Sequence, residues 1–327
     1  MSYRLDPALP ISEALRFVAL AELDIAHTSL AGPPDRHKGV HSARKCFKRL
    51  RSLLGLARPG MPEPLYANLN KRVAKIGKGL AAARDAHALF DALNTLERKT
   101  EPGLGDAPIE AMRDWLQERR EAAARNLERS SASQSLEMLL ELRPRFASLV
   151  VYPDDFTPLS KGLQLNYYRA REQFKSASRK KDPALLHDWR KSVQRHWRHM
   201  QLLTACWPSE LGARAEAARG LSQTLGDDHD IANLMHLATA PAMTFGTPED
   251  VSAFLKRCKI RLKELRKDAK VRGERLFVEK PQPFAGRIHA YWTTAAVGAL
   301  KPVAAAPQSN NVVAIDDARP EPAMQSS

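Results

Sequence analysis

The feature that most constrains this chain is a short pattern that occurs twice. One copy, HSARKCFKRLRSLLGL, begins at His41, and the other, HDWRKSVQRHWRHMQLL, begins at His187. In both copies an arginine follows the histidine at +3, a lysine at +4 and an arginine at +8. Asp85 and Asp230 then follow at intervals that agree within one residue. Each copy has one segment of helical spacing before it and two after it, so we predict an internal duplication of a four-helix unit.

Helix-breaking residues mark the ends of the predicted helices. Clusters of Pro, Gly and Asp recur along the chain, and the runs between them carry apolar residues at helical spacing. Asp182-Pro183 and Thr247-Pro248 each place an N-cap oxygen before a proline that suits the first helical position. No segment keeps the residue alternation with a period of two that is typical of β-strands. We therefore predict an all-α protein.

The predicted architecture is two pseudo-symmetric four-helix bundles, related by internal duplication, around a basic central groove. The first helical half is expected over residues 8–150 and the second over residues 155–294. The last stretch, residues 302–327, is polar and rich in small residues, so we expect a disordered tail there.

The charge balance points to a polyanionic partner. The 327 residues include 51 Lys and Arg against 37 Asp and Glu, which gives a net charge of +14.

The three cysteines, Cys46, Cys206 and Cys258, lie far apart in the sequence, which argues against a disulfide framework or a thiolate zinc site. The N-terminus lacks a continuous apolar run, and no later run is long enough to cross a bilayer. We expect a cytoplasmic protein without membrane contact.

The repeated helix is predicted to have one apolar face and one cationic face. At about 100° per residue, the cations of each copy gather into a stripe that contains no acid. The stripes comprise His41, Arg44, Lys45, Lys48, Arg49 and Arg51 in the first copy and His187, Arg190, Lys191, Arg195 and Arg198 in the second. Like charges at this spacing destabilise an isolated helix. A basic helix face is most often simply solvated, but solvation does not explain why the same residue types recur at the same offsets. We therefore predict that both stripes bind a polyanion.

Catalytic motifs are weak in comparison. The run Asp227-Asp228-His229-Asp230 resembles the His-Asp dipeptide of metal-dependent phosphohydrolases, but the first half has Ala83-Arg84-Asp85 in that place, without a histidine. The repeated aspartates are expected to orient arginines or to cap helices. His196 and His199 have no third metal ligand near them in sequence. No phosphate-loop, serine-hydrolase or zinc-protease motif occurs. We expect no enzyme activity, no metal and no cofactor.

Through these motifs the chain resembles the CHAD family, the conserved-histidine α-helical domain. The resemblance covers residues 8–294. It rests on the His-x-x-Arg-Lys helix of both halves, the LGDDHD segment, the helix from Gly162 to Arg171 and the closing GERLFVEKPQPFAGRIHAYW. It implies two four-helix bundles about a pseudo-twofold axis and a basic central groove that binds inorganic polyphosphate, often at polyphosphate granules. The family's binding pattern falls on the stripe residues, to which we add Arg84 and Arg171 as candidate ligands.

The two copies depart from each other, and the chain departs from some relatives. Gln194 stands where the first copy has Lys48, so the halves are expected to contribute unequally. His196 and Trp197 likewise stand where the first copy has Leu50 and Arg51. The sequence shows no acidic triphosphate-tunnel (CYTH) domain of the kind often fused to this family, so triphosphatase activity is not expected.

The sequence as a whole predicts a non-enzymatic polyphosphate-binding protein at polyphosphate granules. Three alternatives remain open: a protein that binds RNA or DNA phosphates, a metal-dependent phosphohydrolase that uses His229 and Asp230, and a helical scaffold for an acidic protein. Aromatic residues make up only 6% of the chain, so no more than weak nucleic-acid binding is expected. No oligomeric state is predicted.

Overall fold

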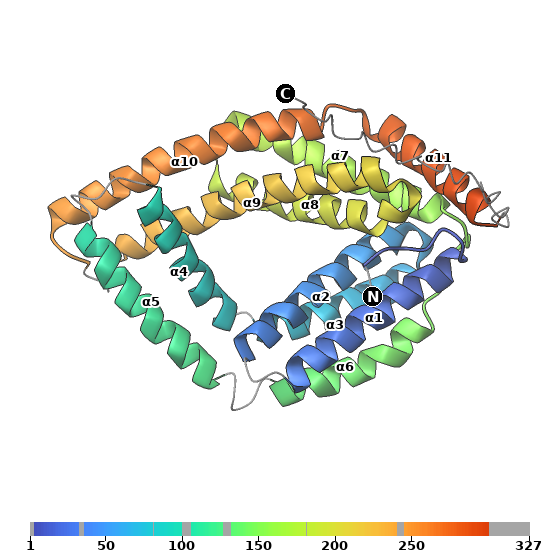
Figure 1. Ribbon diagram of the computed structural model, residues 1–327, viewed down its shortest axis with the longest axis horizontal. Helices are drawn as coiled ribbons and strands as arrows, with labels where there is room; N and C mark the ends of the chain where they lie inside the picture. The colour runs from blue at the N-terminus through green and yellow to red at the C-terminus, as the bar shows by residue number, and fades with distance from the viewer. Residues whose placement is uncertain are drawn as a thin grey trace, which may run out of the picture.

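The computed structural model describes residues 3–32, 36–80, 82–99, 106–126, 132–180, 182–240 and 245–300. These residues form helices and connecting turns, with no strand among them, which confirms the prediction of an all-α protein. In order, the helices are α1 (Ile11–Ala31), α2 (Arg36–Ala57), η1 (Arg58–Gly60), α3 (Glu63–Gly79), α4 (Ala82–Arg98), α5 (Asp106–Asn126), α6 (Ala132–Ala147), α7 (Thr157–Lys180), α8 (Pro183–Leu202), η3 (Thr204–Cys206), α9 (Pro208–Ala238), α10 (Pro248–Leu276) and α11 (Pro281–Leu300) (Figure 1). The predicted tail at 302–327 lies outside the described residues.

Two helix starts follow the capping chemistry read from the sequence. The Asp182 carboxylate accepts a hydrogen bond from the Ala184 amide at 2.8 Å, directly before Pro183 at the start of α8. Thr247 and Asp250 form a capping box at the start of α10. These side chains satisfy backbone amides that have no partner inside the helix, which fixes where each helix begins.

The hydrophobic residues form two cores. The larger one joins α1, α2, α3, α6, α7, α8 and α11 with the first part of α9 and the last part of α10. The smaller one packs α4 and α5 against the opposite ends of α9 and α10 (Figure 1). Because α9 and α10 are long enough to take part in both, they connect the two cores. Two helices from the first part of the sequence thus pack on two from the second. The helix order is compatible with a duplication, and the boundaries at 8–150 and 155–294 stay predictions.

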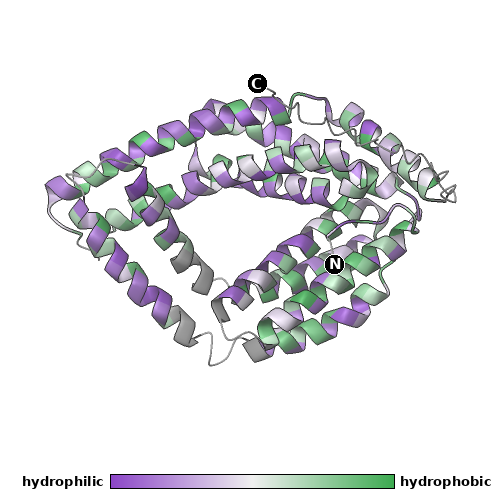
Figure 2. Ribbon diagram, in the orientation of Figure 1, coloured by the Kyte–Doolittle hydropathy of each residue, from purple (hydrophilic) through white to green (hydrophobic). Residues whose placement is uncertain are grey.

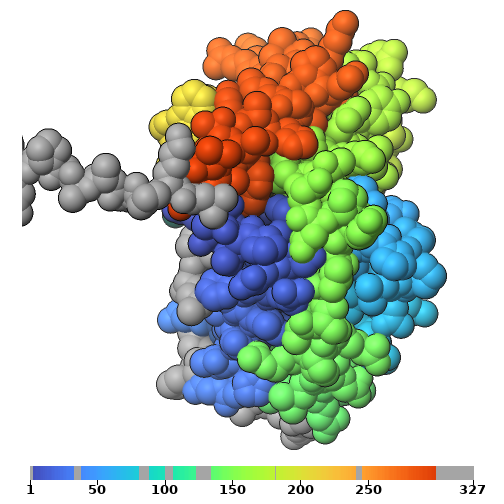
Figure 3. All heavy atoms as spheres, turned by 90° about the vertical axis from the view of Figure 1, so that its right-hand side faces the viewer, coloured from blue at the N-terminus to red at the C-terminus, as the bar shows by residue number. Residues whose placement is uncertain are grey.

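The helices around the larger core fall into two groups that α7 holds together. The chain passes from α6, in the lower group with α1 to α3, into α7, which joins the upper group (Figure 3). α7 also crosses α2 at very short range: a Cβ atom added to Gly162 would lie 2.0 Å from the Leu56 carbonyl oxygen. Only glycine permits this approach of two backbones. The crossing brings α2 and α8 to opposite sides of one space.

The helices of the elongated molecule differ in hydropathy. Hydrophilic residues cover long stretches of α5 and α10, whereas α1 and α6 show more hydrophobic residues (Figure 2). Within the part of the chain that the structure describes, no helix combines the length and the apolar character that crossing a bilayer requires.

Candidate functional site

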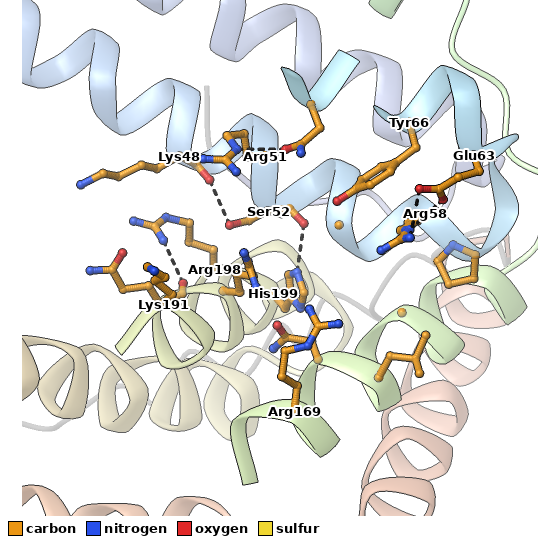
Figure 4. Close-up of a pocket in the computed structure, with 18 residues that line it drawn as sticks. Lys48, Arg51, Ser52, Arg58, Glu63, Tyr66, Arg169, Lys191, Arg198 and His199 are labelled. Atoms are coloured by element: carbon orange, nitrogen blue, oxygen red, sulfur yellow. Dashed lines mark hydrogen bonds and ion pairs between the residues drawn. The ribbon is translucent and has the colours of Figure 1, made fainter. Parts of the chain in front are cut away.

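Between the two helix groups lies a pocket of about 870 Å³, which we call the basic pocket. Its walls come from α2, η1, α3, α7 and α8. Its cationic lining residues are Lys48, Arg51, Arg58, Arg169, Lys191, Arg195 and Arg198. Lys48 and Arg51 lie on one side, and Lys191 and Arg198 face them from the other (Figure 4). The two repeated helices therefore turn part of their cationic faces toward one shared space.

Helical spacing explains which residues reach the basic pocket. Along α2 the lining residues are Lys48, Arg51, Ser52 and Gly55; along α7 they are Gly162, Leu165, Asn166 and Arg169; along α8 they are Lys191, Gln194, Arg195, Arg198 and His199. Each set follows steps of three and four residues, so each occupies one face of its helix. On α2 and α8 these faces continue the C-terminal parts of the predicted stripes.

The basic pocket has a strong excess of positive charge. Among the described residues, Glu63 is the one acid in its lining, and both Glu63 carboxylate oxygens accept hydrogen bonds from Arg58, at 2.9 and 3.0 Å. Arg51 donates to the side-chain oxygen of Asn70, at 2.9 Å, and thus bonds to a neutral group. Lys191 pairs with Asp188 at 3.0 Å, in an exposed contact. Most of the positive charge in the pocket is therefore not neutralised by the lining itself.

The guanidinium groups of Arg195 and Arg198 are largely shielded from water. Burial lowers the pKa of Arg198 to about 10, and its guanidinium donates to the Gln194 carbonyl oxygen at 3.0 Å. The pKa of Arg195 is also lowered, first by burial and then by repulsion from Arg169 and Arg51. Arg195 makes no hydrogen bond or ion pair with any described residue. An anion among these guanidinium groups would relieve both the repulsion and the loss of hydration.

A neutral histidine joins the two repeated helices at the base of the basic pocket. His199 is fully buried, and its Nε2 donates to the Ser52 carbonyl oxygen at 2.9 Å (Figure 4). Burial lowers the pKa of His199 to about 4, so the ring is neutral at pH 7. This hydrogen bond connects α8 to α2 and holds the cationic faces in register.

Three predicted ligands are engaged in the structure outside the basic pocket. Arg49 forms an ion pair with the buried Glu22 at 2.9 Å. Arg44 donates to the Gly77 carbonyl oxygen at 2.6 Å, and Arg171 donates to the Phe277 carbonyl oxygen at 3.1 Å. Their guanidinium groups join helices to one another. None of the three lines the basic pocket.

The remaining predicted ligands lie nearer the N-termini of the two helices. His41 and Lys45 are exposed on α2. His187 stacks on His229 with ring centroids 4.8 Å apart, and Arg190 lies beside them on α8. Burial, followed by the charge of Lys191, lowers the pKa of His187. The side chains of Arg84 and Asp85 lie outside the described residues. Of the predicted ligands whose side chains the structure describes, Lys48, Arg51, Lys191, Arg195 and Arg198 line the basic pocket and the others do not.

The acidic run on α9 is divided between two environments. Asp228 is buried and accepts from Arg266 at 2.7 Å, which is a structural contact. His229 Nδ1 and the Asp230 carboxylate lie 3.1 Å apart. Among the residues that the structure describes, no three His, Cys, Asp or Glu side chains are grouped as metal ligands. His229 and Asp230 thus bind each other and gather no third ligand.

Two cations of the basic pocket, Arg58 and Arg169, were not predicted from the sequence. Arg169 was detectable, because it lies seven residues after Gly162, on the same face of α7. The choice of Arg171 on that helix overlooked this periodicity. Arg58 lies in η1, directly after the end of α2, and continues the same spacing seven residues after Arg51.

Comparisons with known proteins agree on the fold. A family model described as CHAD domain matches residues 20–239. PptA from Streptomyces chartreusis is similar in structure, with a TM-score of 0.61 and 14% sequence identity, over 83% of this chain and 100% of that chain. The CHAD domain from the plant Ricinus communis is similar with a TM-score of 0.55 and 18% identity, over 90% and 95% of the respective chains. No curated protein sequence matches this chain.

Proposed function

Because this chain belongs to the CHAD family, we propose that its basic pocket binds inorganic polyphosphate. One observation carries the proposal: cations from three helices and η1 line a single space in which the one acid among the described lining residues is already paired with Arg58. A linear chain of phosphates supplies one negative charge or more at every unit, which matches several cations in a row.

The lining residues suit phosphate oxygens chemically. Arg51, Arg169 and Arg195 offer planar guanidinium forks that can donate two hydrogen bonds to one phosphate. Lys48 and Lys191 add flexible point charges on facing helices. Asn70 and Asn166 provide neutral amide donors in the same lining. The basic pocket therefore combines fixed forks with adjustable charges, as an extended and flexible polyanion requires.

Titration of long-chain polyphosphate over a salt series tests the proposal. The pocket variant is Arg51→Ala, Arg169→Ala, Arg195→Ala. The matched control, Lys256→Ala, Lys259→Ala, Lys263→Ala, removes the same charge from exposed positions on α10. Charge-assisted hydrogen bonds contribute about 1.5–3 kcal/mol each, so the pocket variant should lose at least about tenfold in affinity. Its salt slope should also fall by about one for each lost phosphate contact. Equal losses in the two variants would contradict the proposal.

RNA binding is the nearest alternative, since phosphate groups present the same charges. Inorganic polyphosphate carries more charge per unit length and no bases, so it should displace bound RNA at a much lower phosphate concentration than the reverse. RNA that resists displacement would favour the nucleic-acid alternative.

A phosphohydrolase with His229 and Asp230 predicts release of orthophosphate from polyphosphate in the presence of Mg²⁺ or Mn²⁺. We expect no such release from the full chain. Release that is lost in His229→Ala would establish the enzyme instead.

Association with polyphosphate granules follows if the pocket binds long chains in cells. A fluorescent fusion should gather at granules and spread evenly in cells that lack them. The pocket variant should stay dispersed, whereas the α10 control should still gather. Granule recruitment of the pocket variant would indicate another contact, such as an acidic granule protein.

A further inference from the structure

A second hollow continues the basic pocket along α7 and α8. This apolar groove has a volume of about 420 Å³. Leu165 and Arg169 line both the groove and the basic pocket, so the two spaces adjoin. From Arg169 the groove extends toward the start of α8, where Leu185 lines it. One end of a ligand in this position would meet guanidinium groups and the other end would meet apolar side chains.

The walls of the apolar groove suit a flat ring. Leu165 and Tyr168 are 61% and 55% exposed, so a ligand in the groove can reach both side chains. Tyr168 stacks on no other ring among the described residues. A half-exposed tyrosine beside two leucines offers a stacking surface at little cost in conformational entropy.

The apolar groove is lined by hydrogen-bond acceptors as well as by the donors of Arg169 and Ser176. Gln173 lines the groove, and its Oε1 is buried with no hydrogen-bond donor among the described residues. A buried amide oxygen without a partner costs free energy, so a ligand donor here would be stabilising. The carboxylates of Glu172 and Asp188 also line the groove, and each pairs with a lysine in an exposed contact. A ring that presents N–H groups would therefore find acceptors in the groove, of which the Gln173 oxygen has no donor among the described residues.

We propose that the apolar groove binds the base of a purine nucleoside 5′-polyphosphate whose phosphates occupy the basic pocket. This inference rests on the proposed phosphate binding by the basic pocket. Adenine and guanine have amino groups that can donate to Gln173 or to the carboxylates, and both stack well on tyrosine. Arg169, at the junction, is placed for the phosphate nearest the ribose. An apolar peptide would fill the groove equally well, but it would gain nothing from the adjoining cations.

Tripolyphosphate and GTP are the two probes, because each carries three phosphates and only GTP carries a base. Calorimetric titration of the full chain should give tighter binding for GTP, with ATP similar and UTP weaker. Tyr168→Ala should weaken GTP about tenfold, the factor that about 1.4 kcal/mol of lost stacking produces, and leave tripolyphosphate unchanged. Tyr168→Phe should bind GTP like the wild type. Arg195→Ala should weaken both ligands. Tyr152→Ala, at a tyrosine 82% exposed elsewhere, is the matched control and should weaken neither.

The outcomes separate this inference from the proposed function. If the wild type binds tripolyphosphate as tightly as GTP, or if Tyr168→Ala leaves GTP binding unchanged, the base site does not exist. Polyphosphate binding would then still stand. If the wild type binds neither tripolyphosphate nor long-chain polyphosphate, both proposals fail together.

Discussion

The two copies of the repeated helix place the same residue types in different surroundings. Arg49 and Arg195 hold the same place in their copies, yet Arg49 pairs with the buried Glu22 while Arg195 lines the basic pocket without an ion pair to a described residue. Likewise Leu53 of α2 is an ordinary core residue, whereas its counterpart His199 is a buried neutral histidine. A repeated pattern therefore determines which residues are cationic. The neighbouring helices determine which groups those cations contact.

The two copies also differ in how exposed their pocket-lining cations are. α8 is closely surrounded by α7, α9 and α2, so Arg195 and Arg198 are poorly hydrated and the buried His196 and His199 are neutral at pH 7. Arg51 and Lys48 on α2 are more exposed. We expect α8 to supply strong, fixed contacts and α2 to supply charges that attract and adjust to the polyanion.

Arg49→Ala should give the largest effect, and on stability. Glu22 is 2% exposed, and removal of its partner leaves a buried charge unpaired, which costs about 3–5 kcal/mol. Chemical denaturation measures the loss. The control Arg72→Ala breaks the exposed pair with Glu141 and should cost less than about 1 kcal/mol. Arg49 and Arg195 hold equivalent positions in the two copies, and we assign the structural role to Arg49. Similar losses of stability in Arg49→Ala and Arg72→Ala would contradict that assignment.

Acid should destabilise the protein through the buried histidines of α8. The folded pKa of His199 is lowered to about 4, below its ordinary value of 6.5, so the folded state resists protonation. The contribution is complete above pH 6.5 and is lost as the pH falls from 6.5 toward 4, by about 3 kcal/mol for a group of this kind. Burial lowers the pKa of His196 as well.

Denaturation at pH 7, 5.5 and 4.5 checks this prediction. The variant His196→Leu places a leucine where the first copy has Leu50 and removes one buried titratable ring. Its free energy of unfolding should therefore fall less steeply with acid than that of the wild type. An identical pH dependence in both proteins would rule out His196 as a source of the acid sensitivity.

Arg195→Ala should weaken polyphosphate binding by about tenfold or more, because one charge-assisted contact is lost. Its stability should be unchanged or higher, since repulsion from Arg169 and Arg51 is relieved. Fluorescence titration and thermal denaturation measure the two quantities on the same sample. A folded Arg195→Ala protein with wild-type affinity would refute the binding role of this residue.

Gln194→Lys should give the smallest effect and would make the copies more alike. The substitution places a lysine where α2 has Lys48, in the lining of the basic pocket. Affinity for polyphosphate should rise a few-fold at low salt, and the gain should shrink as salt is raised. Gln117→Lys, on α5, adds the same charge away from the pocket and should produce no comparable gain.

Much of the fold and part of the site could be predicted from the sequence. Proline and glycine breaks, capping residues and apolar spacing predicted the all-α fold, and the repeat led to Lys48, Arg51 and Arg195. The sequence could not reveal the different role of Arg49, because Glu22 reaches it from another helix. Nor could it reveal that α4 and α5 pack on α9 and α10, since that contact depends on residues far apart in the chain. Local periodicity assigns faces, and tertiary packing assigns their partners.

A crystal structure of the full chain with a short polyphosphate would test the central claim most directly. The account predicts phosphate groups in the basic pocket, within hydrogen-bond distance of Arg51 on α2, Arg195 on α8 and Arg169 on α7. Phosphates bound only to the exposed lysines of α10, with the basic pocket empty, would contradict it.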